Sequence, residues 1–304
     1  MLKELITLYR EYNLVMNGVL VIDKPENWTS HDVVAKCRKI LATKRIGHTG
    51  TLDPFATGVM VLLIGKATRL ARFLKDDKEY IATIRFGFET TTGDLTGQAK
   101  HSIKEVNLSE DEINSALSFF RGEIEQVPPM FSAKKLEGKK LYVLARQGVE
   151  VARRPVKVNI HELKLIKVLS PTDVLIRVAC SAGTYIRVLA EQIGRELGIG
   201  AHLIELKRTR VGDFRLDQAL TLEQLQTLFA QGKLRLISMN EALAHLKEMK
   251  LTPAEVARIK NGVPISKSNG HADDKEIIRL TSGDDLIAIA IFNGNIIQPK
   301  IVLV

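Results

Sequence analysis

The segment from Gly47 to Gly58, GHTGTLDPFATG, has the residue types that most strongly suggest chemistry. Its three glycines and its proline predict a tight loop in which the backbone can approach a ligand closely. One imidazole, His48, and one carboxylate, Asp53, project from this loop. Pro54 favours an extended conformation of Asp53, which would hold that carboxylate in one direction. The pattern alone leaves two interpretations, a catalytic carboxylate or a residue that stabilises a turn.

Several common sites are excluded by their spacing. Cys37 and Cys180 are far apart and form no CxxC pair, so a thiolate zinc site is not expected, and both are read as core residues of a protein from the reducing cytoplasm. No two histidines have metal-binding spacing and no GxGxxG is present. Residues 58–66 have the wrong spacing for a P-loop, and Ala67 replaces its Ser or Thr. We therefore predict neither a metal nor a cofactor.

The charge of the chain is uneven. The formal net charge is +9, while residues 251–304 have equal numbers of acidic and basic residues, so the excess lies in residues 1–250. A basic surface of this kind attracts a polyanion such as nucleic acid, although a solvated basic face without a partner would look the same. The basic clusters are 36–45, 69–75, 134–140, 153–154 and Lys207, Arg208 and Arg210.

Hydrophobic periodicity predicts strands and helices in alternation. Strands are expected at 18–22, 59–64, 79–88 and 174–180. Helices are expected at 31–41 with Ser30 as N-cap, at 66–75, after the capping box of Ser109 and Glu112, at 184–197 and around 222–229. No apolar run is long enough to span a membrane.

The organisation of the chain changes near residue 248. Short strands and turns follow, including a hairpin formed by 286–292 and 296–304 around an Asn-Gly turn. Residues 1–16 suit a short amphipathic helix and lack the apolar core of a signal peptide. We predict an N-terminal extension (1–16), a catalytic domain (17–247) and a small β-rich domain (248–304).

The loop motif resembles a known family. GHTGTLDPFATGVM closely resembles motif II of the TruB pseudouridine synthases, approximately GHxGTLDPxAxGxL. The resemblance extends over residues 17 to about 245, with Asn27 and Thr91 as departures from the family pattern. Further matching segments are VIDKP with Thr29-Ser30, the KEY strand at 78–80, QVPPMFSAKK at 126–135, ARQG at 145–148, GTYIR at 183–187 and GAHL at 200–203 with Leu206.

The resemblance implies an α/β (α+β) fold, with a central mixed, largely antiparallel sheet flanked by helices and a small C-terminal PUA-like domain. It also implies isomerisation of one uridine in the T loop of tRNA to pseudouridine. The N1–C1′ bond breaks, the base turns, and C5 rejoins C1′, so no cofactor is required. The expected enzyme is a cytoplasmic monomer that needs no protein partner and binds the T stem-loop of tRNA.

The resemblance also assigns the catalytic residues. Asp53 would be the catalytic carboxylate, acting as nucleophile or as electrostatic support for an oxocarbenium-like state. Arg187 would pair with Asp53 and hold it ionised and oriented. Tyr185 would contact the base or ribose edge and shuttle the proton at C5. Without the motif, Arg187 reads as a surface residue and Tyr185 as a packing residue at a helix start.

Five further residues are implied in substrate binding. Tyr80 would stack on the target base, and Leu206 would form the apolar floor beneath it, although both also fit a plain core. His48 would fill the space left when the base flips out. Lys24 would support the site or contact phosphate, and Asp94 would hydrogen-bond within the site. The basic segments 31–45 and 66–75 would follow the RNA backbone.

Two alternatives remain open from sequence, and a third is disfavoured. A dyskerin-type relative that works inside a guide-RNA particle shares the aspartate motif. An RNA-binding or RNA-folding factor without chemistry would share the basic surface. An aspartyl-phosphate enzyme would need a second aspartate and Mg²⁺ ligands, which the motif lacks.

Overall fold

The computed structural model describes residues 16–101, 104–136, 138–266, 275–293 and 295–304. The helix predicted over residues 1–16 therefore falls outside the described residues, apart from Met16. Within the described ranges, no helix is both long enough and apolar enough to cross a membrane.

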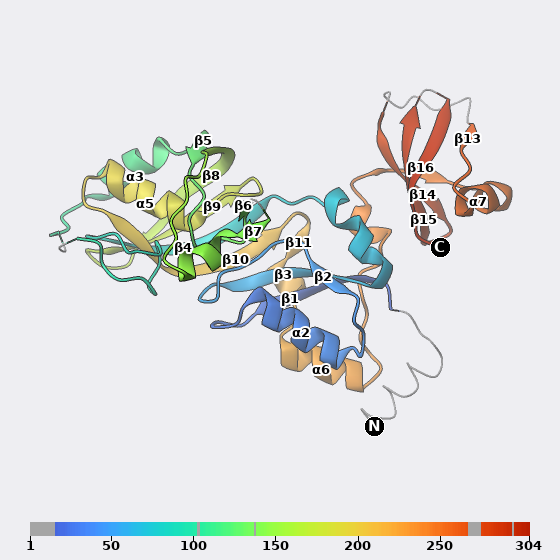
Figure 1. The fold of residues 1–304 in the computed structure, drawn as a ribbon, viewed down its shortest axis with the longest axis horizontal. Helices are drawn as coiled ribbons and strands as arrows, with labels where there is room; N and C mark the ends of the chain where they lie inside the picture. The colour runs from blue at the N-terminus through green and yellow to red at the C-terminus, as the bar shows by residue number, and fades with distance from the viewer. Residues whose placement is uncertain (1–15, 102–103, 137, 267–274, 294) are drawn as a thin grey trace.

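The larger part of the protein is built on one mixed sheet of nine strands (Figure 1). The order is β1-β3-β10-β4-β9-β8-β5, with β2 paired to β3 and β11 to β10. All pairs are antiparallel except β3 with β10, so the expected mixed, largely antiparallel sheet is confirmed. The strands are β1 (Gly18–Lys24), β2 (Ile46–His48), β3 (Thr57–Ile64), β4 (Lys78–Phe86), β5 (Gly122–Gln126), β8 (Val156–Val168), β9 (Asp173–Cys180), β10 (Ala201–Val211) and β11 (Phe214–Arg215).

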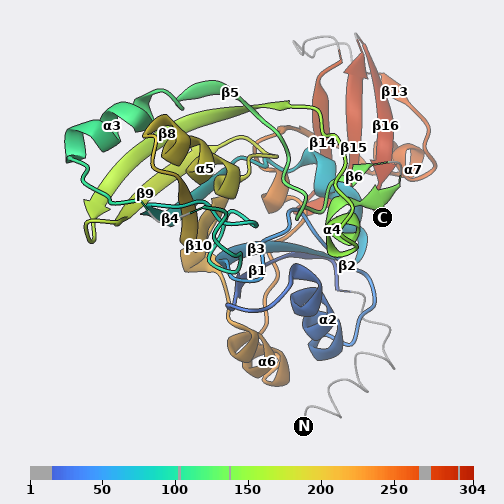
Figure 2. The same ribbon diagram turned by 60° about the vertical axis from the view of Figure 1, so that its left-hand side comes forward.

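Two pairs of helices cover two parts of this sheet (Figures 1 and 2). α3 (Glu110–Ser118) and α5 (Ile186–Glu196) pack on β4, β8, β9 and β10, with Ile113, Leu117 and Leu189 among their core residues. α2 (Ser30–Ile40) and α6 (Leu222–Ala230) pack on β1 and β3, chiefly through apolar side chains on their inner faces. The two cores place the helices that carry Arg187 and Ser30 on neighbouring sections of one sheet.

Two predicted helix starts and one predicted helix type were wrong. α2 is capped by Thr29, not Ser30, because the Thr29 side chain accepts from the Asp32 amide. α5 begins at Ile186, two residues later than predicted. The segment predicted as an α-helix at 66–75 is a 3-10 helix, η1 (Gly65–Phe73), in which the Thr68 hydroxyl donates to the Gly65 carbonyl and competes with regular helical bonding.

A smaller five-stranded sheet begins at Lys247. Its order is β12-β14-β15-β16-β13, and the predicted hairpin is its β15–β16 pair, with the turn residue 294 outside the described residues. Its strands are β12 (Lys247–Lys250), β13 (Ile265–Ser266), β14 (Ile277–Ser282), β15 (Asp285–Asn293) and β16 (Ile296–Val302), flanked by α7 (Pro253–Lys260).

The smaller sheet shares a core with the larger one. Leu286, Ile289 and Ile301 pack in one apolar cluster with Val59 of β3 and Leu70 of η1. In Figure 1, the cyan turn of η1 lies between the two sheets. The two parts are therefore joined by buried side chains as well as by the chain itself. The short helices η2 (Leu216–Gln218) and η3 (Glu241–Leu243) lie on the connection between them.

A separate insertion connects β5 to β8. It contains a two-stranded ribbon of β6 (Lys135–Leu136) and β7 (Lys139–Lys140), followed by α4 (Leu141–Arg146). The segment leading into it includes Phe131, whose carbonyl accepts from Arg187 in the candidate site.

Candidate active site

The loop between β2 and β3 is held from three directions. The Thr49 amide donates to the Val61 carbonyl at 3.2 Å, and the Ala56 amide closes a turn onto the Asp53 carbonyl at 3.1 Å. The Ser30 hydroxyl accepts from the Leu52 amide at 2.9 Å and donates to the Leu52 carbonyl at 3.2 Å. Because Thr29 caps α2, the Ser30 side chain is free to fix the residue just before Asp53.

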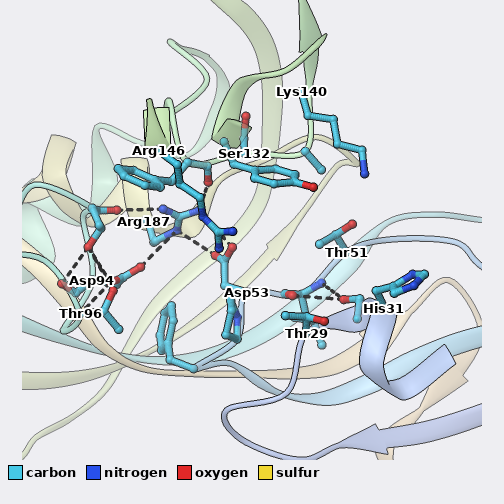
Figure 3. A pocket seen from close by; sticks show the side chains of 18 of the residues that line it. Thr29, His31, Thr51, Asp53, Asp94, Thr96, Ser132, Lys140, Arg146 and Arg187 are labelled. Carbon is cyan, nitrogen blue, oxygen red and sulfur yellow. Dashed lines mark hydrogen bonds and ion pairs between the residues drawn. The ribbon is translucent and has the colours of Figure 1, made fainter. Parts of the chain in front are cut away.

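Asp53 and Arg187 form a two-pronged ion pair (Figure 3). Nε of Arg187 donates to Oδ2 at 2.8 Å, and Nη2 donates to Oδ1 at 3.1 Å. The Arg187 side chain is 5% exposed, while that of Asp53 is 32% exposed. Bidentate pairing fixes the plane of a carboxylate as well as its position. The exposed part of Asp53 therefore faces the cavity in one orientation.

The same guanidinium also joins two other segments. Nη1 donates to the Thr92 carbonyl and Nη2 to the Phe131 carbonyl, each at 2.8 Å. Nε lies 3.7 Å from Oδ2 of Asp94, which places Arg187 between two carboxylates (Figure 3). Oδ1 of Asp94 accepts from the Thr96 amide at 2.9 Å, so this buried carboxylate is fixed by its own loop.

Asp53 stands where two cavities meet. The larger has a volume of about 710 Å³ and is lined by His48, Lys140 and Arg146. The smaller has a volume of about 310 Å³ and is lined by Tyr80 and other residues described below. Both cavities share the same wall, which consists of Thr51, Leu52, Asp53, Ser132, Ala133 and Arg187.

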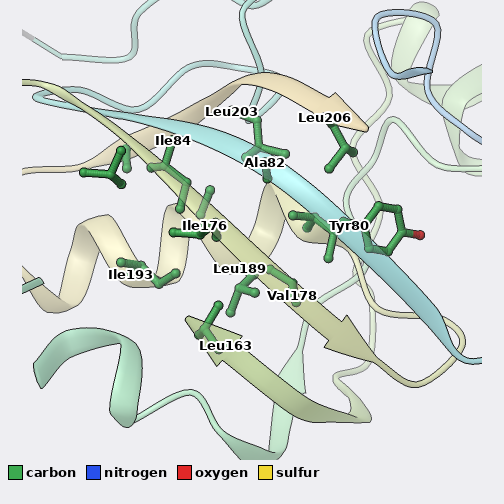
Figure 4. Close-up of a cluster of buried hydrophobic side chains, with 14 of the residues drawn as sticks. Tyr80, Ala82, Ile84, Leu163, Ile176, Val178, Leu189, Ile193, Leu203 and Leu206 are labelled. Atoms are coloured by element: carbon green, nitrogen blue, oxygen red, sulfur yellow. The ribbon is translucent and has the colours of Figure 1, made fainter. Parts of the chain in front are cut away.

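The smaller cavity can hold a flat ring. Tyr80 of β4 and Leu206 of β10 lie on neighbouring strands at one end of the main apolar cluster (Figure 4). Burial raises the pKa of Tyr80, which therefore stays a neutral phenol. Tyr185 is the N-cap of α5, and Gln126 fixes its backbone by accepting from its amide at 2.9 Å and donating to its carbonyl at 3.2 Å.

The larger cavity has a basic rim. Lys140 and Arg146 flank the ring of Tyr142, with their cations 5.5 and 5.6 Å from its centre. His48 lies at the end of β2, where desolvation and the nearby Arg208 guanidinium lower its pKa. A neutral imidazole on this wall could stack with a base, and the two cations could contact phosphates.

The Lys24 side chain lies beneath the loop that carries Asp53, where backbone carbonyls surround its ammonium. Its ammonium is fully buried and donates to three carbonyls, those of Pro25 at 2.9 Å, Trp28 at 2.7 Å and Pro54 at 3.0 Å. Burial lowers the pKa of Lys24 to about 8. Of the two roles implied for Lys24, the geometry favours support of the loop over contact with phosphate.

Sequence reasoning missed Arg208. It was counted in a basic surface cluster, but it is 1% exposed and donates to the carbonyls of Val59 at 2.7 Å, Thr51 at 3.3 Å and Gly50 at 3.1 Å. Strand alternation could have found it, because Arg208 lies two residues after the buried Leu206 on the same face of β10.

The fold thus brings the residues that the sequence resemblance assigned to the site together around Asp53. Asp53, Arg187 and Asp94 form a charged row, while Tyr80, Tyr185 and Leu206 line the smaller cavity. His48 lines the larger cavity, and Lys24 lies beneath the loop. An ionic carboxylate beside a pocket for a flat ring is an arrangement that can act at the sugar carbon of a nucleoside.

Comparison with known proteins gives a consistent result. A family model described as TruB family pseudouridylate synthase (N terminal domain) matches residues 38–186. A second, described as tRNA pseudouridylate synthase B C-terminal domain, matches residues 187–251.

The chain is also similar to curated proteins over nearly its whole length. The tRNA pseudouridine synthase B of Solibacter usitatus is 44% identical over 294 residues, which cover 95% of this chain and 100% of the relative. The protein of the same name from Aromatoleum aromaticum is 41% identical and covers 96% of this chain and 94% of the relative.

Solved structures agree on the fold. The crystal structure of a Cbf5-Nop10-Gar1 complex contains a chain with a TM-score of 0.73 and 27% identity, covering 98% of this chain and 87% of the other. A chain in the archaeal box H/ACA sRNP Nop10-Cbf5 complex has a TM-score of 0.70 and 25% identity, covering 97% and 88%. From the family models and the extent of the curated similarity, this chain belongs to the TruB family of pseudouridylate synthases.

Proposed function

We propose that this protein isomerises one uridine to pseudouridine in the T loop of tRNA. The observation that carries the proposal is the bidentate Asp53–Arg187 pair at the wall shared by two cavities. Relatives named tRNA pseudouridine synthase B, at 40–44% identity over most of the chain, support tRNA as the substrate.

The reaction needs a base that has left its stack. Uracil would enter the smaller cavity, between Tyr80 and Leu206, and His48 would fill the vacated space in the loop. The cost of unstacking is a few kcal/mol, which contacts of Lys140 and Arg146 with the RNA backbone would help to offset.

Asp53 then faces C1′ of the target nucleotide. The N1–C1′ bond breaks with its electron pair leaving on uracil, and the carboxylate either bonds to C1′ or stabilises the positive charge there. After the base turns, C5 bonds to C1′, the proton on C5 is removed, and N1 is protonated. Tyr185, which lines the base cavity, would shuttle the C5 proton. Atoms and electrons balance without a co-reactant.

The two domains would bind different parts of the tRNA. Residues 17–247 would form the catalytic domain, and residues 248–304 would act as a PUA-like module that contacts the acceptor end. The smaller module has no net charge, counted over 251–304, so its contribution would depend on shape. We further propose that the enzyme is a cytoplasmic monomer.

The test uses unmodified tRNA and the protein alone. Pseudouridine should appear at one T-loop uridine, and tRNA with cytidine at that position should yield none. A guide-dependent enzyme would be inactive on bare tRNA, which would overturn the proposal. That alternative is disfavoured because the Cbf5 chains are only 25–27% identical, whereas the tRNA enzymes reach 44%.

Two further measurements test the contribution of the smaller module and the monomeric state. An isolated T stem-loop without the acceptor end should still be modified, with KM raised by only about threefold, since the smaller module adds little. Sedimentation should give the mass of one chain, 33.8 kDa.

A further inference from the structure

The hydroxyl of Ser132 is buried without a hydrogen-bond partner among the described residues. Ser132 is 6% exposed. Six buried side-chain polar atoms share this condition in the part of the chain that the structure describes, but only Ser132 belongs to a residue that lines either cavity of the site. A buried hydroxyl left unpaired is costly, so its presence here calls for a partner that arrives with the substrate.

The backbone holds Ser132 firmly in place. Its amide donates to the Met130 carbonyl at 2.9 Å, and its carbonyl accepts from the Tyr142 amide at 3.1 Å. The preceding carbonyl, that of Phe131, accepts from Nη2 of Arg187 at 2.8 Å. The same guanidinium that orients Asp53 therefore also fixes the residue before Ser132, so the backbone of Ser132 has a defined position relative to the carboxylate.

Under the proposed function, the sugar of the target nucleotide would lie beside Ser132. Ser132 belongs to the wall shared by the base cavity and the larger cleft, together with Asp53 (Figure 3). With uracil in the smaller cavity and the RNA backbone in the larger one, the ribose occupies the junction. Asp53 acts at C1′ there, and the neighbouring carbon carries the 2′-hydroxyl. Asp53 and Arg187 are already bonded to each other, whereas the Ser132 hydroxyl has no partner in the part of the chain that the structure describes.

We propose that the Ser132 hydroxyl hydrogen-bonds to the ribose 2′-hydroxyl of the target uridine. This contact positions C1′ against the Asp53 carboxylate and distinguishes RNA from DNA at that nucleotide, since the 2′-hydroxyl is the group that differs. The proposal rests on the proposed function and names the sugar contact of the same site.

The experiment crosses a protein change with a substrate change. Ser132→Ala and the wild type are assayed on tRNA with uridine or 2′-deoxyuridine at the target position. On the uridine substrate, Ser132→Ala should lower kcat/KM about tenfold, as expected for one neutral hydrogen bond. On the deoxyuridine substrate, the two proteins should differ by less than about twofold, because the contact is already absent. If the deoxy substrate does not react, the same comparison is made with its dissociation constant.

Ser109→Ala serves as the matched control. Ser109 caps α3, outside both cavities, so its loss should lower the thermal stability and leave the discrimination between the two substrates unchanged. Ser132→Ala should not lower the stability of the free protein, because it removes an unpaired polar group.

Two results would overturn the inference. One is an equal loss on both substrates by Ser132→Ala, which would mean a structural role. The other is no loss on the uridine substrate. If the wild type forms no pseudouridine from the uridine tRNA, the proposed function itself fails, and that outcome is seen before any variant is compared.

Discussion

Two buried arginines, Arg187 and Arg208, contact the loop that carries Asp53, and the two are bound in different ways. Arg187 donates to the carboxylate of Asp53 and to two carbonyls. Arg208 donates to three carbonyls, of Gly50, Thr51 and Val59, and has no carboxylate partner within salt-bridge distance among the described residues. Arg187 orients the Asp53 carboxylate, while Arg208 holds the backbone of the loop that carries Asp53.

The close approach of β3 and β10 accounts for the position of Arg208. Gly58 has φ +100°, and a Cβ there would lie 2.2 Å from the Arg208 carbonyl oxygen, so only glycine lets β3 approach β10 this closely. The Arg208 side chain then reaches the loop and donates to the partly buried carbonyls of Gly50 and Thr51. Both arginines are buried and charged, so only their acceptors distinguish Arg187, which orients the proposed catalytic carboxylate, from Arg208.

The largest effect on activity should come from Arg187→Lys. Lysine keeps the charge but cannot make the two-pronged bond, so kcat should fall about 1,000-fold, in the range for loss of an oriented donor at a reacting centre. Multiple-turnover assays with saturating tRNA measure kcat. Arg195→Lys, on the exposed side of the same helix, is the control and should change kcat by less than about twofold. A loss below about tenfold for Arg187→Lys would break the comparison.

Arg208→Leu should act mainly on stability. The buried Val59 carbonyl and the partly buried carbonyls of Gly50 and Thr51 lose their donor. Since an unpaired buried group costs about 1–3 kcal/mol, the free energy of unfolding should fall by about 2 kcal/mol. Urea denaturation measures the change. The kcat of the folded fraction should fall by less than that of Arg187→Lys. A stable Arg208→Leu protein with no activity would reverse the roles given to the two arginines.

Asp94→Asn should have a smaller effect. Its carboxylate lies 3.7 Å from Nε of Arg187, and an amide retains an oxygen that can accept from the Thr96 amide. Loss of this longer ion pair should lower kcat about fivefold, equivalent to about 1 kcal/mol, with tRNA affinity unchanged. Steady-state assays and filter binding separate the two. A loss as large as that of Arg187→Lys would make Asp94 an equal partner of Asp53.

The smallest effect concerns the loop that carries Asp94. Arg195 and Lys100 bond to Glu89, and Arg195, as the stronger cause, lowers the pKa of Glu89 to about 2. Arg195 is 58% exposed, so solvent weakens the pair, and Glu89→Gln should cost only about 1 kcal/mol at neutral pH.

The stability that Glu89→Gln removes should depend on pH. Because the folded pKa of Glu89 is depressed, its stabilisation is complete above the unfolded value of 4.5 and is lost as pH falls towards 2. Denaturation curves of wild type and Glu89→Gln should therefore converge between pH 4.5 and pH 2. A difference that stays constant over this range would show that the ion pair does not stabilise the loop.

Much of the fold was predictable because its signals are local. The strands at 18–22, 59–64 and 174–180 follow from continuous apolar runs, and the capping box of Ser109 and Glu112 is present as predicted. These features depend on neighbouring residues, which the sequence displays directly.

The corrections arise where distant segments meet. Thr29 and Ser30 are both good caps, and the choice between them is made by Leu52, whose backbone takes the Ser30 hydroxyl. Strand alternation could have shown that Arg208 is buried, but its carbonyl partners become visible only when its strand lies beside β3 and Gly58. Ser132 falls within the matching segment at 126–135, but an unpaired hydroxyl can be recognised only when the residues around it have been placed.

The most direct test of the account is pseudouridine formation by Asp53→Asn on unmodified tRNA, measured beside its tRNA affinity. The amide fills the same space beside Arg187 but carries no negative charge. We expect no detectable product, with a dissociation constant within about threefold of that of the wild type. Continued formation of pseudouridine by Asp53→Asn would contradict the assignment of Asp53 as the catalytic carboxylate.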